Sequence, residues 1–368
     1  MKILHLLSGG GIGGIEMLCL NIAKLSRDQN EFCFLYSGGE IAEEMRQKGI
    51  PVYLYCEEQL AVRMWKLWKL VKKEQYDVVI VHHEGVGIYS FYLLLSYAFP
   101  KIKFMKYLHC AFEEQYFYVG NKFKDWLYYT LLKKTLLKSD CVIAVSEFVK
   151  KSYCEEFGYE TDKVVVIYNG IQLGDSAKCV EEIQSDKVVK LLYIGRLVEV
   201  KGVRKLLEAV KQLLEEDQNI ELDILGDGNE RLQYEKFVFE NHLESQVHFR
   251  GYQLDKEVYY RNNPIFVYPS IWQEAFGISI VEALAHGLIC VASNVGGIPE
   301  IITDKQNGYL FEHDKENDLV NALKRAIAGQ RNSSDTEMRK AAYARSLFFD
   351  IDNTIDMLQK VLRRCKEG

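Results

Sequence analysis

The sequence predicts an α/β protein of two domains, each built on a parallel sheet with helices on both faces. Short apolar runs alternate with helical stretches along most of the chain, which is typical of parallel sheets covered by helices. At 368 residues the chain is long enough for two domains that each bury a core. The alternation stops after residue 170 and resumes near residue 189, so we expect the domain boundary between these positions.

The first domain is expected over residues 1–170. It opens on a buried strand at residues 3–7, followed by a glycine loop and a helix whose apolar residues recur at helical spacing. Further strands are expected at residues 31–36, 52–55, 78–81, 104–108, 142–145 and 164–167.

The second domain is expected over residues 189–345, after a polar and aperiodic linker at 171–188. Its pattern indicates strands at 189–194, 221–225 and 247–249, and helices at 203–214, 229–241 and 319–328. A last amphipathic helix is expected at 335–362. We expect the C-terminal segment 346–368 to pack back on the first domain.

Composition narrows the class of protein. With 48% hydrophobic and 27% charged residues, the chain is typical of an ordered globular protein. A net charge of -6 argues against a nucleic-acid binder. The nine cysteines form no C-x-x-C pair, and Cys33, Cys141 and Cys290 lie in apolar strands, as expected for reduced core residues of a cytoplasmic protein. Because the first expected strand begins at once, we expect no signal peptide, and the longest apolar run, 88–99, is too short to span a bilayer.

Residues 268–299 carry the strongest signal for a ligand site. They read as strand, loop, helix, strand and glycine-rich turn, with the helix expected to begin near Phe276 or Gly277. Glu274 then lies before the helix and Glu282 inside it. A helix start that is small and glycine-led suits a phosphate.

The two glutamates allow three interpretations. They could form the acid/base pair of a hydrolase, but about 1.5 Å per residue places them roughly 12 Å apart, so different roles are favoured. They could also be structural, with Glu282 on a helix face and Glu274 as a partner of the helix dipole.

Other polar residues also follow expected strands. Arg196 and Lys201 lie in GRLVEVKG, between a strand and a helix start, where two cations would clamp a phosphate, although exposed loop cations are common. His109 follows the strand at 104–108, where ligands of open α/β sheets bind, although a lone histidine is more often structural. His82 and His83 follow another strand without the spacing of metal ligands.

A dinucleotide-binding oxidoreductase is a further alternative. Gly9, Gly11 and Gly14 match the G-x-G-x-x-G fingerprint, but five glycines in six positions fit many patterns. That fingerprint requires an acid after the second strand to bind the ribose. The expected second strand ends in Ser-Gly-Gly, and Glu31 lies at its other end, so this alternative is disfavoured.

Two basic and aromatic segments, 62–73 and 117–138, lie in the first half. Residues 63–138 hold 13 Lys and Arg against 6 Asp and Glu. Basic residues beside Trp and Tyr are the mixture that settles at an anionic membrane surface. The segments could equally be ordinary domain helices with solvated lysines, and both interpretations stay open.

The order of these motifs resembles the retaining, nucleotide-sugar-dependent glycosyltransferases of the GT-B fold, in particular glycosyltransferase family 4. The resemblance spans the chain: GGIE in the N-terminal loop, YNGI before the linker, then GRLVEVKG, LGDG, FRGY, EAFGISIVEALAHG and GGIPEII. It implies two Rossmann-like domains facing a central cleft.

The resemblance also implies roles for individual residues. It assigns four catalytic residues: Arg196, Lys201, Glu274 and His109. Donor binding is assigned to Gly13, Gly14, Gly195, Gly226, Gly228, Gly251, Tyr252, Phe276, Gly277, Ile278 and Glu282. In this scheme the two cations hold the donor diphosphate, Glu274 contacts the sugar, Glu282 contacts the ribose, and His109 faces the acceptor and the donor sugar.

The implied reaction moves a sugar from a nucleoside-diphosphate sugar, preferably a UDP-sugar, to a glycan or lipid-linked acceptor in cell-surface polysaccharide biosynthesis. No D-x-D motif is evident at a suitable loop, so we expect neither a metal nor another cofactor. The enzyme would work in the cytoplasm, in peripheral contact with an anionic membrane. A nucleotide-sugar 2-epimerase of the same architecture and a non-catalytic sugar-nucleotide binding protein remain alternatives.

Overall fold

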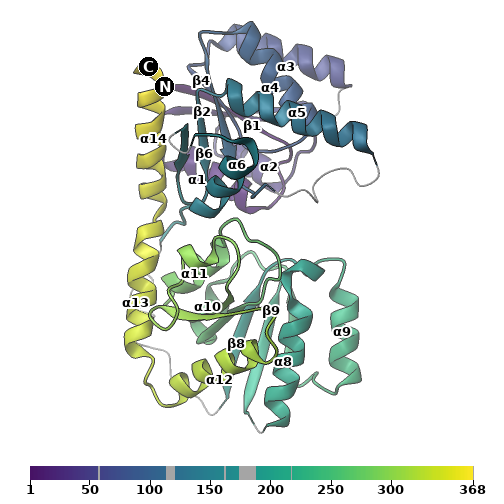
Figure 1. Ribbon diagram of the computed structural model, residues 1–368, viewed down its shortest axis with the longest axis vertical. Helices are drawn as coiled ribbons and strands as arrows, with labels where there is room; N and C mark the ends of the chain where they lie inside the picture. Colours follow the sequence, from purple (N-terminus) through teal and green to yellow (C-terminus); the bar gives the residue numbers. More distant parts are fainter. Residues whose placement is uncertain (57–58, 113–120, 161–162, 174–187, 217, 368) are drawn as a thin grey trace. The chain divides into compact units, whose positions relative to one another are not determined.

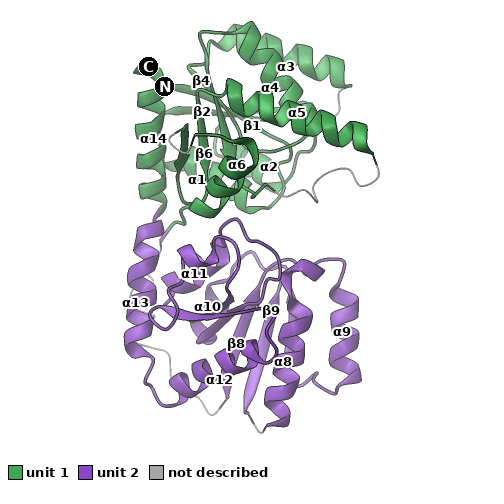
Figure 2. Ribbon diagram, viewed as in Figure 1, with its two compact units in different colours: residues 1–172, 351–368 green, residues 173–350 purple. Residues whose placement is uncertain are grey.

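The computed structural model describes residues 1–368 except 57–58, 113–120, 161–162, 174–187, 217 and 368. The chain forms two compact units (Figure 2). Unit 1 comprises Met1–Gln172 together with Ile351–Gly368, and unit 2 comprises Leu173–Asp350. Most of the segment expected as a linker, 174–187, lies outside the described residues.

Unit 1 is built on a parallel sheet of seven strands in the order β3-β2-β1-β4-β5-β6-β7 (Figure 1). The strands are β1 (Lys2–Leu7), β2 (Gln29–Phe34), β3 (Val52–Leu54), β4 (Val78–Val81), β5 (Lys103–Leu108), β6 (Cys141–Ala144) and β7 (Val164–Val166). Most of them form where the sequence is a short apolar run, because both faces of the sheet are covered, whereas β2 begins with three polar residues. The second strand begins two residues earlier than the apolar pattern predicts.

Helices cover both faces of this first sheet. On one face, α1 (Gly14–Leu25) and α2 (Glu40–Gln47) bury Cys19, Leu20 and Ile41 against β1 and β2. On the other face, α3 (Leu60–Glu74) and α4 (Val86–Ala98) pack on β1, β4 and β5, and α5 (Lys122–Lys138) packs on α4. The last helix of this half is α6 (Glu147–Phe157).

Unit 2 repeats the arrangement with a parallel sheet of six strands in the order β10-β9-β8-β11-β12-β13. The strands are β8 (Val189–Ile194), β9 (Ile220–Leu225), β10 (Val247–Gly251), β11 (Ile265–Tyr268), β12 (Ile289–Ser293) and β13 (Gly308–Phe311). One face packs on α8 (Val203–Glu215), α9 (Arg231–Glu240) and α12 (Asp318–Arg331). Among the described residues of this unit, the remaining α-helices are α10 (Glu257–Asn262), α11 (Ile278–Ala285) and α13 (Thr336–Ser346). Helix α11 packs against α13.

The long C-terminal helix predicted over 335–362 is wrong as a single element. The structure has α13, a 3-10 turn at Leu347–Phe349, and then α14 (Ile351–Glu367). The break falls where the chain leaves one core for the other: Phe349 is buried against Phe276 in unit 2, whereas the Ile351 N–H donates to the Ile171 carbonyl in unit 1. From there α14 packs against α1 within unit 1.

Both sheets have the strand order that creates a ligand site at the carboxyl ends of their strands. In unit 1 the order of successive strands across the sheet reverses between β1 and β4, and in unit 2 it reverses between β8 and β11, although all strands run parallel. Ligands of open parallel sheets bind at these switch points. The loops that follow β1, β4, β5, β8, β9 and β11 are therefore where functional residues are expected.

The cysteines and the hydropathy of the helices were also considered in the sequence. Cys33, Cys141 and Cys290 are buried and free, as predicted for core residues. No helix in the described parts of the chain combines the length and the apolar character needed to cross a bilayer.

Candidate functional site

An ion pair joins two of the predicted catalytic residues in unit 2. Lys201 Nζ lies 2.6 Å from Glu274 Oε1, and both side chains are largely buried, with 15% and 12% exposed. The same ammonium donates to the Tyr268 hydroxyl at 3.0 Å, and Ser270 Oγ donates to Glu274 Oε1 at 2.5 Å. Burial and the negative charge of Glu274 raise the pKa of the Tyr268 phenol, which therefore stays protonated.

Close backbone packing brings these two residues together. Lys201 ends a 3-10 turn after β8, and Gly202 follows it with φ +68°. A Cβ on Gly202 would lie 1.9 Å from the Pro269 carbonyl oxygen, so only glycine lets the two loops touch. The Ile271 N–H donates to the Val200 carbonyl at 3.0 Å and fixes this contact.

The glycine-rich turn after β12 holds Glu274 from the other side. The Gly297 N–H donates to the Glu274 carbonyl at 2.7 Å, and the Gly296 N–H donates to Gln273 Oε1 at 2.8 Å. The backbone of Glu274 is therefore fixed before its side chain meets any ligand. This gives the GGIP motif a structural role that its sequence did not reveal.

The loops after β8 and β9 are also packed backbone to backbone. Gly226 has φ +134°, and a Cβ there would lie 1.9 Å from the Gly195 carbonyl oxygen. A Cβ on Gly228 would lie 2.2 Å from the Leu197 carbonyl oxygen. The Gly251 carbonyl, at the end of β10, accepts from the Gly226 N–H at 2.8 Å. These predicted donor-binding glycines thus lie together at the carboxyl edge of the sheet.

Two predicted site residues are open to solvent. Arg196 is exposed in the loop after β8, and no carboxylate in the described part of the chain lies within 4 Å of its guanidinium. Tyr252 is 54% exposed directly after β10. Arg196 can therefore reach a ligand without first losing a carboxylate partner.

Helix α11 begins at Ile278, within two residues of its predicted start, and Gly277 is its N-cap with φ +122°. Phe276 is buried, so the loop before the helix is anchored. The first N–H groups of a helix point out of its end and carry a partial positive charge. As predicted, Glu274 lies outside this helix and Glu282 inside it.

Glu282 belongs to a different group of side chains from Glu274. Its Oε2 accepts from Lys256 Nζ at 2.5 Å and from the Tyr260 hydroxyl at 2.7 Å. Glu274 instead accepts from Lys201 and Ser270. Two carboxylates with separate cationic partners are not arranged as a hydrolase pair, which favours different roles for them.

In unit 1, the glycine loop after β1 leads into α1. Gly13 is the N-cap of this helix and Gly14 its first residue. A Cβ on Gly13 would lie 2.4 Å from Glu16 Oε2, and Glu16 Oε1 lies 3.4 Å from His83 Nε2. His83 Nδ1 in turn accepts from the Ser8 N–H, so the loop is tied to the end of β4.

His109 lies directly after β5 and is mostly buried. Its ring stacks on Tyr107 with centroids 4.5 Å apart, and its Nε2 lies 3.0 Å from His82 Nδ1. Burial, together with the nearby His83 and Lys106, holds the pKa of His109 well below its usual value. His109 is therefore neutral at physiological pH.

The comparisons with known proteins agree with this architecture. Residues 179–345 match the family model described as Glycosyl transferases group 1, and residues 12–175 match the model described as Glycosyltransferase Family 4. The crystal structure of Alr3699/HepE of Anabaena in complex with UDP superposes with a TM-score of 0.83 at 22% identity, covering 99% of this chain and 100% of that one. The chain is a GT-B glycosyltransferase.

Two curated relatives of this glycosyltransferase cover most of its length. An uncharacterized glycosyltransferase of Methanocaldococcus jannaschii is 25% identical and covers 86% of each chain. The lipopolysaccharide 1,2-N-acetylglucosaminetransferase of Salmonella typhimurium is 28% identical, with 73% of this chain and 68% of that protein covered.

Sequence reasoning missed several residues of the glycosyltransferase that complete these groups. Tyr268 and Ser270 lie within the stretch singled out from the sequence, yet nothing in its pattern distinguished them from strand and loop residues. Lys256 and Tyr260 are four residues apart, a spacing that places them on one face of a helical segment. No local signal connected that segment to Glu282, because the contact is made between α10 and α11.

The buried His5 of the glycosyltransferase generates a prediction about pH. Burial lowers the pKa of His5 to about 4, so the unfolded chain binds a proton below about pH 6.5 where the folded chain does not. Stability contributed by neutral His5 is therefore lost as the pH falls from about 6.5 toward 4. Lowering the pH from 7 to 5 should therefore reduce the unfolding free energy of the wild type by about 2 kcal/mol more than that of His5→Gln.

Urea unfolding of both proteins at the two pH values measures this shift. Taking the difference between them cancels the titration of groups that do not interact with His5. An unchanged difference would show that His5 is not held neutral by its burial.

Proposed function

We propose that this chain is a retaining, metal-independent hexosyltransferase that uses a nucleoside-diphosphate sugar, preferably a UDP-sugar. The observation that carries the proposal is the pairing of Lys201 with Glu274 at the carboxyl edge of the second sheet, beside the exposed Arg196. Cations and a carboxylate held together in this way match the two ends of a sugar diphosphate. The cations bind the diphosphate, and the carboxylate binds hydroxyl groups of the sugar.

Lys201 and Glu274 both keep hydrogen-bonding capacity for such a ligand. A lysine ammonium has three N–H donors, of which two are directed to Glu274 and Tyr268. The third is available for an oxygen of the diphosphate. A carboxylate has about four lone-pair positions, so Glu274 keeps acceptor capacity for sugar hydroxyls after binding Lys201 and Ser270.

In this proposal Glu282 binds the ribose of the donor. Lys256 and Tyr260 hold one carboxylate oxygen, which fixes the orientation of the other. Gly226, Gly228, Gly251 and Tyr252 form the surroundings of the base. The backbone of Phe276, Gly277 and Ile278 contributes donors to the sugar and the phosphate.

Transfer breaks the bond between the anomeric carbon and the diphosphate oxygen. Negative charge then develops on the diphosphate, and the preorganised donors of Arg196, Lys201 and the start of α11 stabilise it in place of a metal ion. The acceptor oxygen forms its bond to the anomeric carbon from the face that the diphosphate leaves, and its proton passes to the departing phosphate oxygen. The anomeric configuration is retained.

The donor and the acceptor are inferred from proteins that this chain resembles. Alr3699/HepE was solved with UDP and with UDP-glucose, which supports a UDP-sugar. The similarity to a lipopolysaccharide glycosyltransferase supports a glycan or lipid-linked acceptor in cell-surface polysaccharide biosynthesis. His109 would face the acceptor and the transferred sugar, and the Gly13–Gly14 loop would approach the donor phosphate.

Substitution of the cations tests the proposal. Arg196→Ala and Lys201→Ala should each lower nucleotide release from the preferred UDP- or GDP-sugar by about 100-fold or more, because charge on the leaving group is then uncompensated. Lys211→Ala is the matched control, since this lysine pairs with Glu215 on the surface of α8. Rates like the wild type in both site variants would refute the clamp. Donor binding without any turnover would favour a non-catalytic binding protein.

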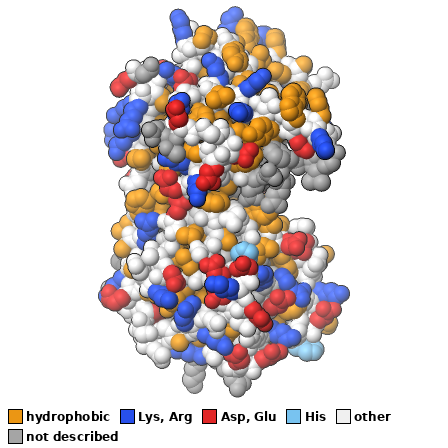
Figure 3. All heavy atoms as spheres, viewed as in Figure 1, with side chains coloured by type: hydrophobic (Ala, Val, Ile, Leu, Met, Phe, Trp, Pro, Cys, Tyr) orange, Lys and Arg blue, Asp and Glu red, His pale blue; other side chains and the backbone are white. Residues whose placement is uncertain are grey.

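A membrane-facing surface is the second part of the proposal. Helices α3 and α5 expose Trp65, Phe123 and Trp126, which are 52%, 69% and 60% exposed, and lysines lie among them. Lys69 Nζ lies 3.6 Å from the centre of the Trp65 ring. Apolar side chains mixed with Lys and Arg are visible on the unit 1 surface in Figure 3. Such a surface would bind anionic lipid and bring the enzyme to a lipid-linked acceptor at the inner face of the cytoplasmic membrane.

Liposome flotation tests this surface. The wild type should float with anionic vesicles more than with neutral ones, and the double variant Trp65→Ala, Trp126→Ala should float less. Phe239→Ala, which removes a 68% exposed aromatic ring from α9 of unit 2, should behave like the wild type. Equal recovery with anionic and neutral vesicles would contradict the membrane proposal.

A further inference from the structure

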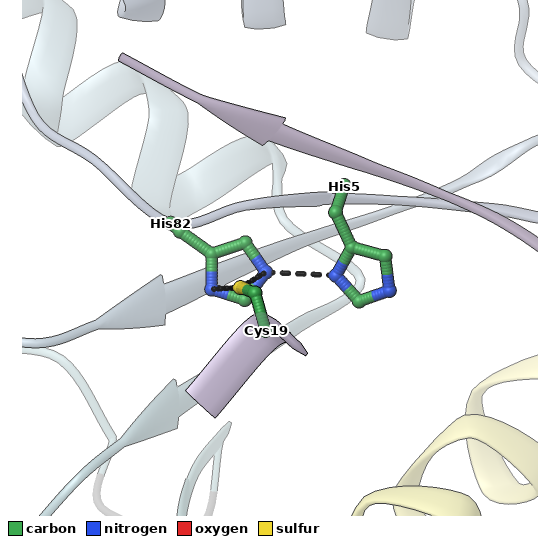
Figure 4. Close-up of side chains that lie close together, drawn as sticks. All are labelled: His5, Cys19 and His82. Carbon is green, nitrogen blue, oxygen red and sulfur yellow. Dashed lines mark hydrogen bonds between the residues drawn. The ribbon is translucent and has the colours of Figure 1, made fainter. Parts of the chain in front are cut away.

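A row of hydrogen-bonded side chains crosses four neighbouring strands of the first sheet and ends at His109. Asn30 of β2, His5 of β1, His82 after β4 and His109 after β5 follow the strand order β2-β1-β4-β5. Asn30 Oδ1 lies 2.9 Å from His5 Nε2, His5 Nδ1 lies 2.9 Å from His82 Nε2, and His82 Nδ1 lies 3.0 Å from His109 Nε2. Figure 4 shows the central pair of this row. We call it the histidine row.

The asparagine fixes the direction of every hydrogen bond in the histidine row. Its Nδ2 donates to the Asp28 carbonyl at 3.0 Å, because the opposite orientation would place two acceptors face to face. Asn30 Oδ1 therefore faces His5 and accepts from His5 Nε2–H. A neutral imidazole has one donor and one acceptor, so His5 Nδ1 must accept from His82 Nε2–H.

The proton on His109, the last ring of the row, is fixed in the same way. His82 Nδ1 must accept, so His109 Nε2 carries the proton and donates to it. His109 Nδ1 then has a lone pair and no hydrogen. All three rings are neutral, since burial lowers the pKa of each of them.

Among the three rings of the histidine row, only His109 has measurable exposure beyond 1%, and at the other end both polar atoms of the Asn30 amide are already hydrogen-bonded. His5 is 0% exposed and His82 is 1% exposed, whereas His109 is 9% exposed. In the described part of the chain, the single hydrogen-bond partner of His109 is His82. Its bare Nδ1 is therefore the place where the row can meet a ligand.

We propose that Asn30, His5 and His82 are positioning residues that hold His109 in the tautomer with a bare Nδ1, so that His109 accepts a hydrogen bond from a hydroxyl group of the sugar substrate. The assignment of a sugar rests on the proposed function, whereas the tautomer does not. A hydroxyl is the fitting partner because it can donate to a bare nitrogen, which an anionic phosphate oxygen cannot do.

A buried metal site is the alternative arrangement of the same residues. Cys19 Sγ lies 3.8 Å from both ring nitrogens of His82, and ligand atoms of Cys19, His5 and His82 lie within 4.8 Å of one another. However, the 2.9 Å between His5 Nδ1 and His82 Nε2 is shorter than the about 3.3 Å that two imidazoles on one tetrahedral zinc require. Binding through His82 Nε2 would also force a proton onto its Nδ1, opposite the donor of His109. Burial further raises the pKa of the Cys19 thiol.

Long-range proton–nitrogen NMR of the whole chain with labelled histidines tests the tautomer without any substrate. We expect His5, His82 and His109 each to carry one proton on Nε2 at pH 7, with a His109→Gln variant used to assign the last resonance. A His109 ring protonated on Nδ1, or on both nitrogens, would overturn the proposal. Stoichiometric zinc in the purified protein, lost on His82→Gln, would also overturn it.

Two variants of Asn30 separate positioning from folding. Asn30→Leu removes the acceptor for His5, so the His109 resonance should shift to a mixture of tautomers, and nucleotide release should fall through kcat more than through KM. Asn30→Asp, when protonated on the oxygen that faces the Asp28 carbonyl, keeps both a donor there and an acceptor opposite His5 Nε2, and should keep the single tautomer. An unchanged His109 resonance in Asn30→Leu would contradict the proposal. If no donor gives turnover, the proposed function fails while the NMR result still decides the tautomer.

Discussion

The ammonium of Lys201 and the carboxylate of Glu274 come from loops that are 73 residues apart in sequence and meet at the carboxyl edge of the second sheet. Most features of the proposed donor site serve this contact. Gly202 allows the two loops to touch, the turn at Gly296 and Gly297 holds the backbone of Glu274, and Tyr268 and Ser270 complete the hydrogen bonding. Removing either charge would leave the other largely buried and unpaired, which is costly.

In the proposed function the pair would also favour binding of an anionic donor. Lys201 and Glu274 neutralise each other before a ligand arrives, so the site does not repel an anion. Arg196 remains exposed on the same loop as Lys201 and, in the proposed function, would supply the additional positive charge that a diphosphate needs. Lys256 and Tyr260 hold Glu282 in a second group, which in the proposed function would separate recognition of the ribose from recognition of the sugar.

The sequence could predict the elements and the motifs because these are local properties. The apolar runs located the strands to within about two residues, and the glycine-led start placed Glu274 before α11 and Glu282 inside it. The single C-terminal helix was wrong because amphipathic spacing continues through Phe349 and Ile351, although these residues enter different cores. Helical periodicity alone does not reveal such a change of partner.

Contacts that depend on strand order could not be predicted. His5 and His82 are 77 residues apart, and they meet only because β1 and β4 are neighbours in the sheet. Lys256 and Glu282 likewise meet through the packing of α10 near α11. These residues carry no motif of their own, since a buried histidine or a helix-face lysine is common in any α/β protein.

Calorimetric titration of the whole chain with nucleoside diphosphates and with the corresponding nucleosides tests the proposed donor site most directly. The account predicts that UDP or GDP binds at least 100-fold more tightly than the nucleoside, which corresponds to about 2.7 kcal/mol from the diphosphate, and that EDTA leaves this difference unchanged. Equal binding of the diphosphate and the nucleoside, or a difference abolished by EDTA, would contradict a site in which Lys201, Arg196 and the start of α11 hold the diphosphate without a metal.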